Sequence, residues 1–227
     1  MPRIYTELPF EPLTWLQRCV LADLRTLCVG MDAYIADPTR TSPSGQPLGG
    51  ANFLLVAGCC AAIEYCGHLY AQGSNDEQRA LAFIRRFLVP VNPRYAEVDE
   101  LFWKCFRNGT IHLSWPKRIE LPGQEAIRTG AGNELSDPHL APAGEIEGAS
   151  FMVNGRRVLA DLEAAVSGDF GEWLRLNDSP ALLERAAPQP YRASGDTLLR
   201  QVANVRRWVR PASVSYTHLT LPTSDLV

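Results

Sequence analysis

Residues Ala51 to Gln72, ANFLLVAGCCAAIEYCGHLYAQ, form a segment that would be apolar on nearly every side of a helix. A helix that is apolar all round is expected at the centre of a protein, with other helices packed around it. The most apolar part, from Phe53 to Ile63, is too short for a bilayer, which needs about 20 apolar residues. The segment therefore predicts the core helix of a soluble protein that does not enter a membrane.

Amphipathic helices are predicted on both sides of this segment. Before it, one apolar stripe repeats every three or four residues and should end at Asp37-Pro38: Leu13, Leu16, Val20, Leu24, Leu27, Met31 and Ile35. After it, a helix is predicted over 76–88, and another runs from the cap Asn92-Pro93 towards Trp115-Pro116. Four helices joined by short links predict a mainly α protein built on an antiparallel helical bundle.

The region after Lys117 has a different pattern. Residues 118–121 and 146–153 are expected to pair as a small two-stranded β element, and Asn154-Gly155 is a turn signal before another helix. Shorter helices are predicted over 180–187 and 197–209. We expect a helical bundle over 1–117, and over 118–213 this β element with additional C-terminal helices, packed on the same domain.

The last residues, 214–227, read VSYTHLTLPTSDLV and resemble translated sequencing-adapter read-through, as found at the ends of metagenomic gene predictions. On that interpretation the tail is non-native, and the natural chain is cut off near Ser213. The alternative is a native polar tail. In either case the tail, including His218, is set aside from the fold and site predictions.

Composition bears on the class of protein. The net charge of −3 shows no overall basic excess of the kind that attracts nucleic acid, and the N-terminus lacks the apolar core of a signal peptide. The cysteines lie in apolar, helix-like stretches, which is typical of reduced thiols in a cytoplasmic protein: Cys19, Cys28, Cys59, Cys60, Cys66 and Cys105. Cys59, Cys60, Cys66 and His68 share one helix and do not easily close a zinc tetrahedron, so neither a metal nor a cofactor is predicted.

One short segment concentrates residues suited to chemistry. Arg107 to His112 reads RNGTIH, with Asn108 directly after the arginine and the histidine at the end. A pattern this short arises by chance about once in a chain of this composition. Its position, near the C-terminal end of an amphipathic helix in a helical bundle, is what makes it a candidate site.

On this motif, and on the helix order over about 13–117, the chain resembles the HEPN superfamily. These are helical-bundle proteins that include metal-independent ribonuclease toxins. The resemblance implies that His112 acts as the general base, that Arg107 stabilises the phosphate, and that Asn108 assists it. It further implies RNA as the ligand, a homodimer with both motifs facing one cleft, and a protein antitoxin or other partner.

The chemistry of these residue types agrees with that role. Metal-free RNA cleavage needs a group that takes the 2′-hydroxyl proton and a cation that stabilises the phosphorane. Histidine titrates in the range required for the first task, and the planar guanidinium suits the second. On a regular helix Arg107 would point about 140° from His112, at about 100° per residue. Either a loosened turn at Gly109 or a dimer cleft would have to bring them together.

Charge and aromatic residues around the motif add to the RNA hypothesis. Basic residues outnumber acidic ones between Arg79 and Arg118, and Lys104, Lys117 and Arg118 are the predicted RNA contacts. Four interleaved aromatic residues are candidates for base stacking: Phe102, Trp103, Phe106 and Trp115.

Each feature also has a structural interpretation. The basic residues fit an ordinary solvated face, the aromatic residues fit a core, and Arg107 and His112 fit a helix C-terminal cap. Glu64 and His68, at i and i+4, form either a structural pair or part of the same cleft. The chain could accordingly be a non-catalytic dimerisation or partner-binding module, or a helical domain of a longer, truncated protein.

Overall fold

The computed structural model describes residues 11–37, 39, 51–72, 75–113, 116–120, 122, 126–132, 137–142, 150–186 and 201. The chain divides into two compact units, Met1–Ala187 and Pro188–Val227. The first unit, which holds nearly all of the described residues, includes both sides of the domain boundary predicted near residue 117.

The described part of the first unit is mainly α-helical, as predicted. Its helices are interrupted by wider π-helical turns, and they follow the predicted ranges closely: α1 (Pro12–Trp15), η2 (Leu16–Val20), α2 (Leu21–Ile35), α3 (Asn52–Tyr70), α4 (Asp76–Phe83), η3 (Ile84–Leu88), α5 (Tyr95–Phe102), η4 (Trp103–Arg107), α6 (Asn108–Leu113), α7 (Gly155–Ser167), α8 (Asp169–Leu176) and α9 (Pro180–Ala186).

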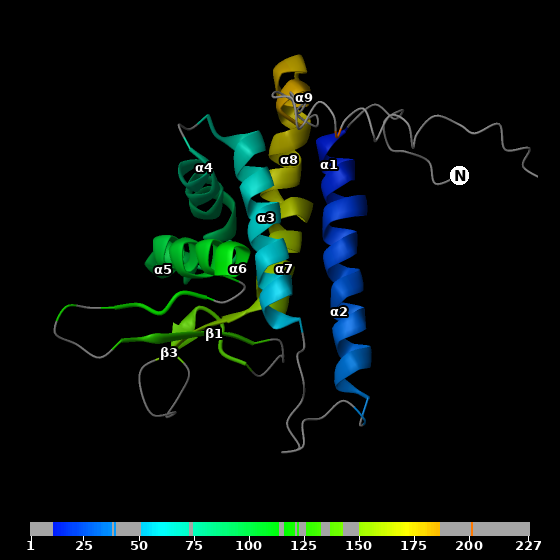
Figure 1. Ribbon diagram of the computed structural model, residues 1–227. Coiled ribbons are helices and arrows are strands. Elements are labelled where there is room, and N and C mark those ends of the chain that lie inside the picture. The colour runs from blue at the N-terminus through cyan, green and yellow to red at the C-terminus, as the bar shows by residue number, and fades with distance from the viewer. Residues whose placement is uncertain are drawn as a thin grey trace, which may run out of the picture. The chain divides into compact units, whose positions relative to one another are not determined.

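Helix α3 is the central helix that its sequence predicts. It packs against α2, α4, η4 and α7 (Figure 1). Its buried residues are distributed around the helix: Leu55, Val56, Cys59, Cys60, Ala62, Ile63, Cys66, Gly67 and Leu69. Among the described residues α3 alone is long and apolar enough to cross a membrane by length and composition, and half of that stretch is buried inside the protein.

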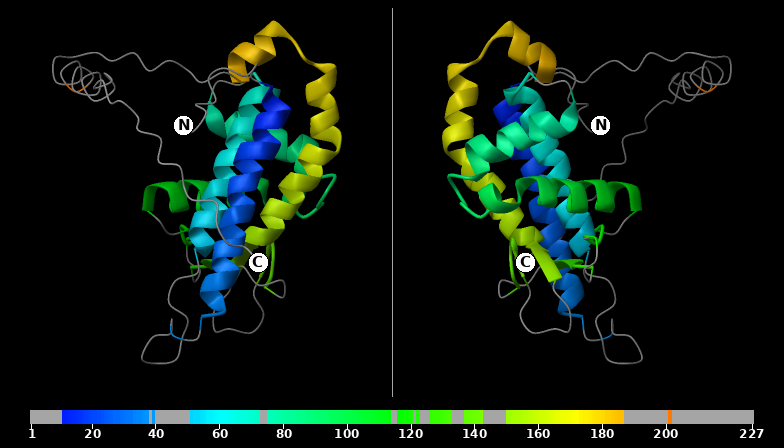
Figure 2. Two further views of the ribbon diagram at one scale, coloured as in Figure 1. Left: turned by 90° about the vertical axis from the view of Figure 1, so that its right-hand side faces the viewer. Right: turned by 90° about the vertical axis from the view of Figure 1, so that its left-hand side faces the viewer.

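The helices are not all antiparallel neighbours. Figure 1 shows α2 and α3 running in opposite directions, whereas α7 and α8 follow the same direction as α3. The continuous helix from α5 to α6 lies at a steep angle to α3, and Figure 2 shows the same crossing from two further sides. The predicted antiparallel bundle therefore describes α2 and α3, while the α5–α6 helix lies across α3.

The β element differs from its prediction in its partner. Strand β3 (Ser150–Asn154) overlaps the predicted 146–153 segment over residues 150–153. It pairs in parallel with β1 (Arg128–Gly132) and not with the predicted partner. The two-residue strand β2 (Ala141–Pro142) adds to β3 in the antiparallel sense, which gives the order β1-β3-β2. In the predicted 118–121 segment, the described residues 118–120 contribute an isolated bridge from Ile119 to Ile127 and no longer strand. The prediction missed β1 because RTGAG has only one β-branched residue, Thr129, no aromatic residue, and two glycines, which are depleted in strands.

Asn154 joins the sheet to the helix that follows. It ends β3, it is fully buried, and its Oδ1 accepts the backbone N–H groups of Arg156 at 3.0 Å and Arg157 at 3.2 Å. These two bonds satisfy donors that the first turn of a helix otherwise leaves unpaired. The predicted helix after Asn154 is thus confirmed, with a break at Gly168 between α7 and α8.

Two predicted segments lie outside the described residues. The expected helix over 197–209 is described only at residue 201, and the 214–227 tail is not described at all.

Candidate functional site

The RNGTIH motif begins at the end of a π-helical turn. In η4 the chain makes a wider turn, and the backbone N–H of Asn108 bonds to the carbonyl of Trp103, five residues earlier. Such turns insert one extra residue into a helix and often occur at functional sites. Residues on either side of η4 therefore do not follow the regular helical angle. The structure describes the backbone of His112 but not its side chain, so the predicted proximity of His112 and Arg107 stays a prediction.

The guanidinium of Arg107 is held by two partners. Its Nε and Nη2 donate to Oε2 of Glu64, on α3, at 2.9 and 2.7 Å. Its Nη1 donates to Oδ1 of Asn108 at 3.2 Å, and its Cζ lies 5.7 Å from the centroid of a Trp103 ring. Because each terminal nitrogen carries two hydrogens, one N–H on Nη1 and one on Nη2 remain without a partner among the described residues.

Arg107 and Glu64 are accessible to solvent. Their side chains are 21% and 26% exposed, and both line an open pocket of about 470 Å³. The α3 side of this pocket follows one helical face, at spacings of three and four residues, and α4 provides the opposite wall. The lining consists of Ala61, Glu64, Tyr65, His68, Asp76, Arg79 and Arg107.

The pocket depends on a close approach of α4 to α3. A Cβ placed on Gly67 would lie 2.6 Å from both the backbone carbon and the oxygen of Arg79. The missing side chain therefore lets the backbone of α4 rest directly on α3, next to His68. Asp76 and Arg79 form an ion pair on this wall, and Oδ1 of Asn75 caps α4 by accepting the N–H of Gln78 at 2.8 Å.

The predicted RNA-contact residues are balanced by nearby carboxylates to different degrees. Lys104 lies 3.5 Å from both Glu77 and Glu100, and Arg118 lies 2.6 Å from Glu120. Lys117 is exposed and has no ion pair among the described residues. Two of the balancing carboxylates, Glu77 and Glu120, lie outside the window from 79 to 118, so the local basic excess is smaller than the window indicates.

The aromatic residues beside the motif belong to the core. Phe102, Trp103 and Phe106 are at most 1% exposed. Phe102 and Phe106 stack on each other with ring centroids 6.1 Å apart. These three residues are therefore not surfaces for base stacking, which confirms their interpretation as core residues. Trp115 lies outside the described residues.

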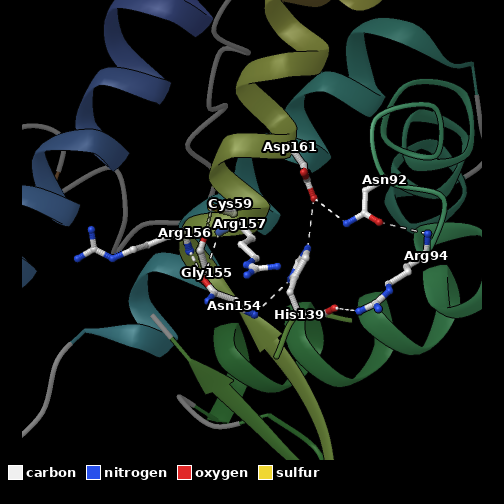
Figure 3. Close-up of polar contacts among 9 residues, drawn as sticks. All are labelled: Cys59, Asn92, Arg94, His139, Asn154, Gly155, Arg156, Arg157 and Asp161. Atoms are coloured by element: carbon white, nitrogen blue, oxygen red, sulfur yellow. Dashed lines mark hydrogen bonds and ion pairs between the residues drawn. The ribbon is translucent and has the colours of Figure 1, made fainter. Parts of the chain in front are cut away.

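A second polar cluster, around His139, was missed at the sequence level. His139 is 3% exposed, and its Nε2 lies 3.2 Å from Oδ2 of Asp161 on α7 (Figure 3). Its Nδ1 accepts the backbone N–H of Asn154 at 3.3 Å, so the neutral ring carries its hydrogen on Nε2 and donates it to Asp161. Asn92 donates to the same carboxylate oxygen at 3.2 Å, and Arg94 donates to the His139 carbonyl at 3.1 Å.

This His139 cluster is structural. Each imidazole nitrogen is engaged, the ring is buried, and the partners belong to β3, α7 and the turn before α5. Tyr95, which is also buried, packs its ring edge-on at 6.0 Å from the imidazole. Burial and the nearby Asp161 carboxylate raise the pKa of Tyr95 well above its ordinary value. The cluster therefore fastens the β element to the helices, and no periodic signal in the surrounding loop could have identified it.

The thiols on α3 are unsuited to metal or nucleophilic chemistry. Cys59, Cys60 and Cys66 are fully buried free cysteines. Burial raises the pKa of Cys60 to about 12, although the nearby Arg107 opposes that shift. These thiols stay protonated near neutral pH, and the thiolate is the reactive form. Among the described residues no group of three or more His, Cys, Asp or Glu side chains is placed to hold a metal ion.

Comparisons with models of known protein families, with curated proteins and with solved structures find no match to this chain. Function is therefore inferred from the pocket and the motif themselves.

Proposed function

We propose that this chain is a HEPN-like cytoplasmic protein that binds RNA and cleaves it without a metal ion. The observation that carries the proposal is the setting of Arg107. The first residue of RNGTIH lines an open pocket, its guanidinium is oriented by Glu64 and Asn108, and two of its N–H groups are left for an incoming ligand.

A phosphodiester matches these donors. A guanidinium presents parallel N–H groups to the oxygens of a phosphate, and the pair with Glu64 holds it in one orientation before the ligand arrives. Because Glu64 already balances much of its charge, Arg107 attracts a singly charged diester weakly. Its attraction for the phosphorane is stronger, because a second negative charge develops there. This stronger binding of the transition state than of the substrate accelerates the reaction.

His112 completes the proposed site. His112 lies on α6, which follows directly after Arg107 at the end of η4. It would take the proton from the 2′-hydroxyl as that oxygen attacks phosphorus. The exposed Lys117 would contact a neighbouring phosphate, with Lys104 and Arg118 as weaker contacts because carboxylates already pair with them. A homodimer, as the HEPN resemblance implies, would bring two such motifs to one cleft.

The test is cleavage of a mixed RNA pool in EDTA by wild type and three variants. Arg107→Ala and His112→Ala are each expected to lose about 10²-fold or more in rate. Arg86→Ala removes an exposed arginine outside the pocket and should match wild type. Circular dichroism checks folding, since Arg107→Ala also leaves Glu64 unpaired. Cleavage that requires a divalent ion, or that survives His112→Ala, would rule the mechanism out.

A second candidate function is a non-catalytic dimerisation or partner-binding module. The ion pairs of Lys104, Arg107 and Arg118 favour it, because paired cations attract a polyanion less strongly. Fluorescence anisotropy with labelled RNA at several salt concentrations separates the two. Absence of both cleavage and salt-dependent binding would select this module over the ribonuclease.

A further inference from the structure

The pocket that holds Arg107 contains a second histidine, which the motif does not include. His68 lies on α3 one helical turn after Glu64, on the same face, and lines the same pocket. We propose that His68 is the general acid of the reaction and protonates the 5′-oxygen that leaves the phosphorus. This inference rests on the proposed ribonuclease function and adds a residue from outside the motif to it.

The chemistry requires two proton transfers. The 2′-oxygen forms a bond to phosphorus, and its proton passes to His112. The bond from phosphorus to the 5′-oxygen breaks, and the departing alkoxide takes a proton from His68. The products are a 2′,3′-cyclic phosphate and a 5′-hydroxyl end, with His112 protonated and His68 neutral until water exchanges the two protons. An alkoxide is a poor leaving group, so the second transfer matters as much as the first.

The other titratable side chains of the described pocket are already committed. Glu64 is paired with Arg107, and Asp76 is paired with Arg79. The hydroxyl of Tyr65 donates to the carbonyl of Ala186 at 3.4 Å, and burial raises the pKa of this tyrosine far above neutrality. These groups, from α3, α4 and η4, are the charged and titratable residues that line the pocket with His68.

His68 is thus the uncommitted residue of this pocket, it is of the type that most often serves as a general acid, and it has no ion pair among the described residues. Its position is also rigid. Helix α3 is packed on several sides, and the neighbouring Gly67 is in direct contact with the backbone of α4. A phosphate bound to Arg107 would therefore have a fixed proton donor on another wall of the same pocket.

Two substrates test this role. RNA needs a proton on its leaving oxygen, whereas uridine 3′-(4-nitrophenyl phosphate) releases nitrophenolate, a stable anion that needs none. His68→Ala and the closely sized His68→Gln should cleave RNA about 10²-fold more slowly than wild type, yet cleave the nitrophenyl ester at close to the wild-type rate. His112→Ala should lose activity on both substrates, because both need the 2′-hydroxyl deprotonated.

The pH dependence supplies a readout that loss of structure would not imitate. The rate on RNA should fall on the alkaline side as the acid loses its proton, and the His68 variants should lack that alkaline limb. Two results would overturn the assignment while leaving the ribonuclease proposal in place. One is that His68→Gln cleaves RNA at the wild-type rate, and the other is that a folded His68 variant loses the same fraction of its rate on both substrates. No cleavage of either substrate by wild type would overturn both.

Discussion

Replacing Gly67 by alanine should weaken the protein, whereas the same change at Gly30 should strengthen it. Both glycines lie within α-helices, on α3 and α2. A Cβ on Gly67 would lie 2.6 Å from the carbonyl carbon and oxygen of Arg79 and 2.8 Å from the nitrogen of Ala80, all of them backbone atoms. A Cβ on Gly30 would meet nothing within 4 Å. The pair therefore isolates the close packing of α4 on α3.

The magnitudes follow from two opposing effects. Alanine is favoured over glycine inside a helix by about 1 kcal/mol, so Gly30→Ala should raise the free energy of unfolding by about that amount. Gly67→Ala makes the same gain but overpacks the α3–α4 contact, which costs about 1–3 kcal/mol. Its net effect is a loss of up to about 2 kcal/mol, and the difference between the two variants equals the steric cost.

Urea unfolding followed by circular dichroism measures both variants against wild type. Displacement of α4 would also move Asp76 and Arg79 and change the pocket, so RNA cleavage should fall in Gly67→Ala and not in Gly30→Ala. Equal stabilisation of the two variants would refute the reasoning, because it would mean that α4 does not rest on Gly67.

Three further predictions concern other parts of the fold. Asn154→Ala removes the cap of α7 and should lower the free energy of unfolding by about 1–2 kcal/mol in urea titrations; an unchanged midpoint would contradict the two cap bonds. Nitrogen NMR should find the His139 hydrogen on Nε2, and a hydrogen on Nδ1 would contradict the bond from Asn154. Cys60 should resist thiol reagents until the protein unfolds. Because burial raises its folded-state pKa from 9.0 to about 12, its contribution to stability is complete below pH 9 and is lost between these values. Alkaline urea titrations of wild type and Cys60→Ala should show a steeper decline with pH in wild type.

Much of the helical structure could be predicted because its signals are local. The stripe from Leu13 to Ile35 and the uniformly apolar α3 both correspond to observed helices. Strand β1 could not be predicted, since its glycines carry no pattern and its partner β3 lies about 20 residues away. The π-helical turn η4 also left no visible signal, although it changes how residues before and after it are oriented.

The candidate site was predictable in part. The spacing of Glu64 and His68 placed them on one helical face, and the motif identified Arg107. The contact between Arg107 and Glu64 joins residues 43 positions apart and was not visible in either segment. The count of basic residues over 79–118 also misled, because the fold pairs Lys104 with Glu77, which lies outside that segment.

The sequence by itself determined a mainly α protein with α3 at its centre, because the burial of a helix depends on apolar residues that recur within a few positions of each other. Only the tertiary structure decided which carboxylate orients Arg107, which residues share its pocket, and how the β element is fastened through His139. Those relations depend on the angle and distance at which separate elements pack. Here the α5–α6 helix crosses α3 at a steep angle, and the missing side chain at Gly67 allows the short distance between α4 and α3.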